Sequence, residues 1–155
     1  MAENDREPLR QAEKVLEGTR ERFALEIVQR NSSKFGEESI FHNGVAGIKV
    51  RHSQRDGEGL HVLVAKLVDG EFPPHPGTIN EETELRRFDI RDIASVRIDR
   101  LLGALSEKIR NNGPLTATDI DVLLTSCCSD VLMGDFSVFR KTSRLVKDRA
   151  RRLAL

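Results

Sequence analysis

AGIKVRHSQRDGEGLHVLVAKLVDG, residues Ala46–Gly70, contains two apolar runs separated by a glycine-rich turn. In the first run, Ile48 and Val50 alternate with basic residues, which is the two-residue period of a half-buried strand. The second run, Leu60–Val68, is apolar on both faces, as is typical of a strand in the middle of a sheet. The segment therefore predicts two paired antiparallel strands.

The turn of this hairpin is predicted at Asp56 and Gly57, because Asp-Gly is a strong two-residue hairpin signal. With the turn there, the register places His52 directly across from His61. Such a pair suggests a shared metal ion or a pH-sensitive contact. Two ligands do not make a metal site, so an ordinary surface histidine pair is the simpler interpretation.

The residues before the hairpin predict one long helix, Glu7–Asn31. Its apolar residues recur at spacings of three, four or seven, which places them on one stripe made of Leu9, Ala12, Leu16, Phe23 and Ile27. The seven-residue spacing of Leu9, Leu16 and Phe23 also suggests pairing with a second helix. The following segment, Ser32–Ser39, is predicted to be a loop.

The residues after the hairpin begin with a proline-rich segment, Glu71–Thr83, which we call the proline loop. Its clustered prolines cannot supply the N–H donors of a sheet, so it is predicted to be a stiff, extended connector. Glu84–Ile90 is predicted as a third strand. Arg91–Pro114 predicts a helix with Asp92 as its N-cap, although alternation within Asp92–Ile98 leaves a strand as the alternative there.

Two further helices are predicted near the C-terminus. Leu115–Asp135 has Thr116 as a candidate N-cap and Asp119 at the third helical position, which is close to a capping box. Gly134 is expected to end this helix, and the last helix is expected from Phe136 onward.

The predicted order is a helix, a small antiparallel sheet of about three strands and then three helices, which favours an α+β fold over alternating α/β. A length of 155 residues suits one domain. Its parts are an N-terminal helix (residues 1–31), the sheet with the proline loop (46–90, loop 71–83) and a helical C-terminal half (91–155).

Charge and cysteine content limit the function classes. The 25 Lys and Arg residues balance 25 Asp and Glu residues, so the whole chain offers no general attraction to nucleic acid or membrane. The only cysteines, Cys127 and Cys128, are adjacent, so they are expected to be reduced and packed in the core. No apolar run approaches the roughly 20 residues of a membrane helix, and the charged N-terminus does not resemble a signal peptide. We expect a cytoplasmic location.

The final segment, SVFRKTSRLVKDRARRLAL (Ser137–Leu155), predicts an amphipathic helix with a basic flank. Its apolar face is formed by Phe136, Phe139, Val146, Ala150 and Leu153. Beside that face lie six basic residues, which we call the basic row: Arg140, Lys141, Arg144, Lys147, Arg151 and Arg152.

The basic row fits three binding roles and one structural explanation. It suits an acidic protein surface, the phosphates of RNA or DNA, or an anionic membrane with the phenyl face buried. Alternatively, basic residues near a helix C-terminus favour the helix dipole and keep an exposed face solvated. Because the rest of the chain is net acidic, contact with the chain's own domain or with a second copy competes with nucleic acid.

The nucleic-acid interpretation has one further argument. LSEKIRNNGPLTATDIDVLL (Leu105–Leu124) resembles the first two helices of winged-helix and helix-turn-helix regulators, in which a Gly-containing turn precedes a Thr- or Ser-capped helix. The resemblance implies that the basic last helix is the recognition helix. The segment Ser126–Asp135 is longer than the short turn of such motifs.

No catalytic motif accompanies these features. Carboxylate pairs such as Glu37-Glu38 lack a positioned partner for acid–base catalysis, the glycines match neither phosphate-loop nor dinucleotide patterns, and no cofactor is expected. The sequence therefore favours a non-catalytic intracellular binding protein, an interaction module that self-associates through its first helix and the basic row. The alternatives are a nucleic-acid-binding regulator that uses the basic row and, third, a small-molecule enzyme without a recognisable motif.

Overall fold

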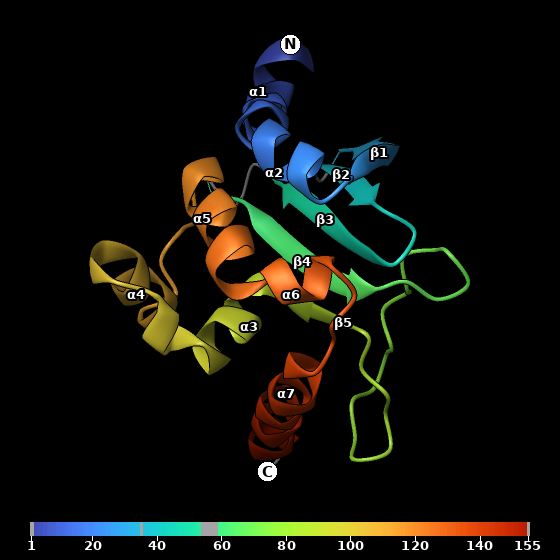
Figure 1. Cartoon of the computed structure of the whole chain (residues 1–155), viewed down its shortest axis with the longest axis vertical. Helices are drawn as coiled ribbons and strands as arrows, with labels where there is room; N and C mark the ends of the chain where they lie inside the picture. The colour runs from blue at the N-terminus through green and yellow to red at the C-terminus, as the bar shows by residue number, and fades with distance from the viewer. Residues whose placement is uncertain (1, 35, 54–58, 155) are drawn as a thin grey trace.

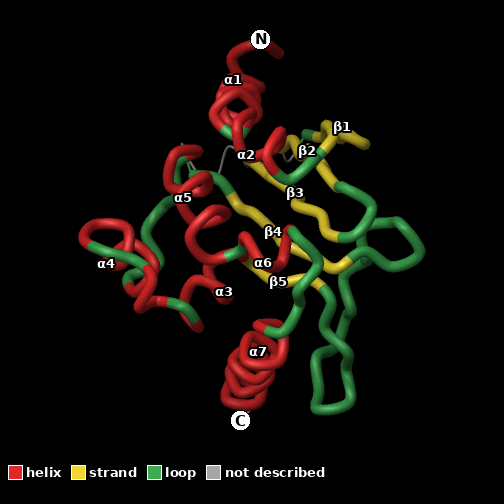
Figure 2. The backbone as a smooth tube through the Cα atoms, viewed as in Figure 1, coloured by secondary structure: helices red, strands yellow, loops and turns green. Residues whose placement is uncertain are grey.

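The computed structural model describes residues 2–34, 36–53 and 59–154, with the backbone alone for residues 2–7 (Figure 1). The described residues form helices and one sheet whose strands all pair antiparallel, which confirms the predicted α+β class. Within these described residues the sheet has five strands, in sequence order, rather than three (Figure 2). They are β1 (Glu26–Ser33), β2 (Gly36–His42), β3 (Ala46–His52), β4 (His61–Lys66) and β5 (Arg87–Asp89).

The helices pack on one side of this sheet, where α1, α3 and α6 contact the strands and α5 lies against α1 and α3. Their bounds are α1 (Ala2–Val15), α2 (Glu17–Arg22), α3 (Ile90–Val96), α4 (Gly103–Arg110), α5 (Ala117–Cys127), α6 (Ser129–Leu132) and α7 (Val138–Ala154), with a 3-10 turn at Ile98–Arg100. Figure 1 shows the N-terminal end of α1 and the C-terminal end of α7 at opposite ends of the molecule.

The core lies between the sheet and these helices. Alternate strand residues such as Phe41, Ile48 and Val64 point into it and are fully buried. On the other face of the sheet, the proline loop approaches two cations: the ring of Phe72 lies 4.9 Å from Nζ of Lys49, and Arg87 donates a hydrogen bond to the carbonyl of Pro73 at 3.3 Å. The first residues of the proline loop therefore cover part of the outer face, and the loop bends at Gly77 and turns at Glu81 and Glu82 instead of staying extended throughout.

The hairpin of β3 and β4 is confirmed, but its predicted register is wrong. Arg51, not His52, lies opposite His61. Because neighbouring residues of a strand point to opposite faces, the buried His52 and the exposed His61 are on different sides of the sheet and do not form a pair. The turn predicted at residues 56 and 57 lies outside the described residues.

The single helix predicted over Glu7–Asn31 is wrong, as is the loop over Ser32–Ser39. The helical stretch ends at Arg22 with Phe23 as the C-cap, and the amide of Leu25 donates to the carbonyl of Arg20 at 2.8 Å. Ala24 adopts the left-handed conformation (φ 55°) that glycine usually supplies at a helix C-terminus. The chain then turns back as β1 and β2, which together span most of residues 26–42.

The helix predicted over Arg91–Pro114 divides into α3, the 3-10 turn and α4. The region Asp92–Ile98 is helical up to Val96, so the strand alternative fails. The carboxylate of Asp89, not that of Asp92, caps α3 by accepting a hydrogen bond from the amide of Arg91 at 2.9 Å. Arg91–Pro114 divides because the backbone at Leu101 and Leu102 is extended and Gly103 has a positive φ of 62°.

The helix predicted over Leu115–Asp135 begins as expected but divides at Cys128 into α5 and α6. The capping box is confirmed: the hydroxyl of Thr116 accepts from the amide of Asp119 at 3.1 Å, and the carboxylate of Asp119 accepts from the amide of Thr116 at 3.0 Å. Gly134, with φ 99°, lies in the turn that ends α6. The predicted third strand is confirmed only in its last part, β5.

Candidate functional site: the basic row of helix α7

Helix α7 carries the basic row and is held to the rest of the protein mainly by its first turns. Val138, Phe139 and Thr142 are buried. The ring of Phe139 makes an edge contact with Phe88, with ring centroids 4.7 Å apart. The predicted apolar face is therefore correct at Phe139, but it does not extend to the end of the helix, because Leu153 is 82% exposed.

A second anchor joins the middle of α7 to α3. The two terminal nitrogens of Arg149 donate to the two carboxylate oxygens of Asp92, both at 2.9 Å. The bidentate contact raises the pKa of Arg149. Sequence reasoning missed this pair, because the two residues are 57 positions apart and no local pattern relates them.

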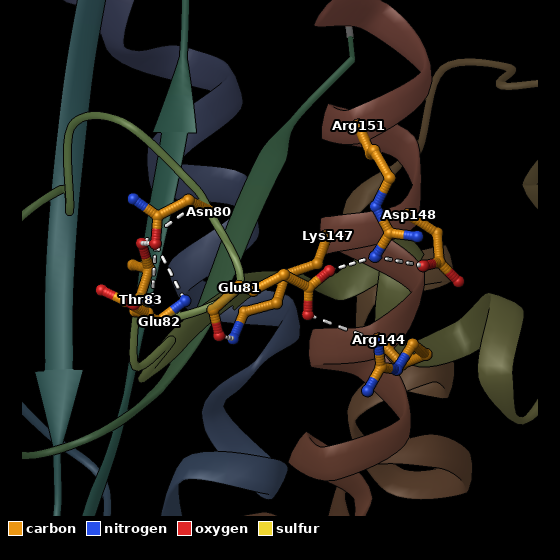
Figure 3. Close-up of polar contacts among 8 residues, drawn as sticks. All are labelled: Asn80, Glu81, Glu82, Thr83, Arg144, Lys147, Asp148 and Arg151. Carbon is orange, nitrogen blue, oxygen red and sulfur yellow. Dashed lines mark hydrogen bonds and ion pairs between the residues drawn. The ribbon is translucent and has the colours of Figure 1, made fainter.

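Three members of the basic row converge on Glu81, at the far end of the proline loop (Figure 3). Nη1 of Arg144 lies 3.5 Å from Oε2 of Glu81, and Arg151 binds Oε1. The ammonium of Lys147 donates instead to the main-chain carbonyl of Glu81 at 2.9 Å. The hydrogen bond from Arg151, together with the neighbouring positive charges, holds the pKa of Glu81 below its ordinary value.

The other three members of the basic row, Arg140, Lys141 and Arg152, are exposed, and their side chains have no hydrogen bond or ion pair with any described residue. Arg140 and Lys141 line a groove of about 630 Å³ between α7 and residues 81–85. Phe139 and Leu85 contribute apolar surface to the same groove. An incoming anion would therefore meet uncompensated positive charge there.

The charges around the basic row are unbalanced. Within the described residues, Glu81 and Asp148 are the only residues whose carboxylates pair with a member of the basic row. Glu81 pairs with Arg144 and Arg151, and Asp148 lies 3.4 Å from Arg151. Glu84, which lines the groove, pairs with Arg86 at 2.9 Å. Exposed pairs of this kind are weak and screened by salt.

The structure does not support a helix-turn-helix arrangement. In such motifs the recognition helix follows a short turn. Here α6 and a second turn separate α5 from α7, and α7 contacts α3. The structure also does not support binding of α7 to a membrane through its phenyl face, because Phe139 is buried in the protein.

The two cysteines and the possible metal ligands were the other candidates for a site. Cys127 and Cys128 are unbridged and buried in the core, as predicted. Burial raises the pKa of both thiols. Among the described residues, no three His, Cys, Asp or Glu side chains are grouped closely enough to hold a metal ion. In the same part of the chain, none of the helices has the length and apolar character needed to cross a membrane.

Comparison of the chain with protein-family models, with curated proteins and with solved structures finds no match.

Proposed function

We propose that this chain is a non-catalytic binding protein whose contact surface is the basic row of α7 and whose partner presents an acidic protein surface. The observation that carries this proposal is the contact with Glu81, in which the row already binds a carboxylate on an exposed polypeptide segment. Arg140 and Lys141 extend the same surface and have no carboxylate of their own among the described residues. The two unbridged cysteines favour an intracellular location.

Charge reversal at the two free cations tests this proposal. The double variant Arg140→Glu/Lys141→Glu is expected to weaken binding of poly-L-glutamate by about tenfold or more, because attraction at the groove becomes repulsion. Fluorescence anisotropy of labelled poly-L-glutamate across a salt series measures the effect. The control Arg10→Glu/Lys14→Glu makes the same charge change on the exposed side of α1. An equal loss in both variants would show only a response to net charge.

Nucleic acid is the second candidate, because the same cations suit phosphates. A labelled DNA duplex is therefore measured beside poly-L-glutamate. The proposal expects the acidic polypeptide to bind more tightly at the same ionic strength. Tighter binding of the duplex, with a steep loss of affinity as salt rises and the same dependence on Arg140 and Lys141, would replace the proposed partner with nucleic acid.

Self-association is part of the proposal, but the apolar stripe of the first helix cannot supply the contact. Leu9, Leu16 and Phe23 are buried in the chain's own core, so they are not free to pair with a second copy. The basic row of one copy against the acidic N-terminal residues of another is the contact we propose. Light scattering at tens of micromolar should give twice the mass of one chain for the wild type. The double variant Arg140→Glu/Lys141→Glu should give a lower average mass. A monomeric wild type would remove self-association from the proposal.

A further inference from the structure

The two ends of the proline loop are held in different ways. At the first end, the centroid of the Phe72 ring lies 4.9 Å from the ammonium of Lys49 and 5.8 Å from the guanidinium of Arg87, and Pro73 is buried. At the far end, the contacts of Glu81 with α7 are exposed to solvent, and the Glu81 side chain itself is 55% exposed. Ile79 packs against the core two residues before Glu81, but exposed ion pairs contribute little to stability. The Glu81 side chain can therefore leave α7 while the rest of the loop stays in place.

The contacts at Glu81 select more than negative charge. Two arginines bind the carboxylate, while Lys147 binds the main-chain carbonyl of the same residue. The side chain of Asn80 accepts hydrogen bonds from the amides of Glu82 and Thr83 at 2.9 and 3.1 Å, which forms a tight turn with Glu81 directed toward α7 (Figure 3). A free phosphate can replace the carboxylate but has no peptide carbonyl to offer Lys147.

We propose that Arg144, Lys147 and Arg151 form a binding site for a glutamate residue on an exposed turn of a partner protein, and that Glu81 fills this site in the free chain. This inference rests on the proposed function. It adds that the ligand is a glutamate residue and that Glu81 competes with it within the same chain. A partner first meets the free cations Arg140 and Lys141 and then displaces Glu81 from the rest of the row. Since Glu81 is tethered beside the site, its high effective concentration lowers the affinity for any partner.

Removing the carboxylate of Glu81 tests this competition. Glu81→Gln is expected to tighten binding of labelled poly-L-glutamate about three- to tenfold, because the arginines lose their internal ligand while the loop keeps its size. Glu82→Gln is the matched control: it removes the same charge from the neighbouring exposed residue, whose side chain has no contact with α7 among the described residues. The control should change the affinity less than twofold.

Each result leads to a decision. Binding by the wild type with no gain in Glu81→Gln overturns the inference and leaves the proposed function intact. An equal gain in Glu82→Gln also overturns it, because net charge then explains the effect. If neither the wild type nor Glu81→Gln binds, the proposed function fails and the site fails with it.

Inorganic phosphate at matched ionic strength provides the second arm of the test. If the site recognises a glutamate residue through its carboxylate and its carbonyl, phosphate should not displace poly-L-glutamate from Glu81→Gln at concentrations where sodium chloride of equal ionic strength does not. Selective displacement by phosphate would show a general anion site and contradict recognition of glutamate.

Discussion

Replacing Phe139 with alanine is expected to lower the free energy of unfolding by about 3–4 kcal/mol, which is typical for a buried phenyl group. Phe139 is 8% exposed, and its ring contacts Phe88 and Phe136 with centroids 4.7 and 5.2 Å away. Among the described residues of α7, the only others that are buried are Val138 and Thr142. The loss of the ring should therefore loosen α7 as well as destabilise the core, and urea denaturation followed by circular dichroism measures the cost.

Phe136→Ala is the matched control for this prediction. Its ring is only half-buried and lies 5.4 Å from the ammonium of Lys66, so about 1 kcal/mol is expected. Phe139→Ala should also weaken poly-L-glutamate binding, although it removes no charge, because the basic row loses its fixed position. If Phe139→Ala costs less than about 1 kcal/mol, then Phe139 is not the main anchor of α7 and another contact holds the helix in place.

The elements that could be predicted from sequence are those with a strong local signal. The Thr116 capping box, the alternation in β3 and the amphipathic pattern of α7 each depend on residues a few positions apart, and each appears in the structure. The strands β1 and β2 carry no such signal. Nearly all of β1 is exposed on both faces, as expected of an edge strand, so its sequence has no two-residue alternation to detect.

The apolar stripe of the first helix shows why a correct pattern led to a wrong boundary. Leu9, Leu16 and Phe23 are all buried, as predicted. The helical stretch nevertheless ends just before Ala24, whose left-handed turn a glycine would have marked in the sequence and an alanine does not. Ile27 and Val28 then continue as a strand, in keeping with the β preference of their branched side chains.

The candidate site was predictable only in part for a related reason. The basic row lies within one helix, so its spacing is visible in the sequence. Glu81 and Asp92, which bind members of α7, are more than fifty positions away and are brought to the helix by the packing of the whole chain. Among the cations of α7 that pair with a carboxylate, Arg149 has the most buried partner, Asp92. The position of Arg149 in the sequence of the helix does not distinguish it from the other basic residues.

Arg97→Ala is expected to cost about 2–3 kcal/mol at neutral pH, because it leaves a partly buried carboxylate without its cation. The guanidinium of Arg97 donates to both oxygens of Asp130, at 2.6 and 2.7 Å, and to the carbonyl of Cys127 at 2.8 Å. The side chains of Arg97 and Asp130 are only 13% and 28% exposed. In the double variant with Asp130→Ala no unpaired charge remains, so it should be less destabilised than the sum of the two single variants.

The cost of Arg97→Ala should also depend on pH. The hydrogen bonds from Arg97 hold the pKa of Asp130 below its ordinary value of 3.8, so the folded state keeps this group ionised at pH values where the unfolded chain takes up a proton. The stability from the pair is then complete above about pH 5 and is lost as the pH falls through the folded-state pKa. The difference between wild type and Arg97→Ala in urea denaturation should stay constant from neutral pH to about pH 5 and narrow below about pH 4. A difference that persists in acid would mean that the Cys127 carbonyl and the packing of the Arg97 chain, rather than the charge of Asp130, make this junction stable.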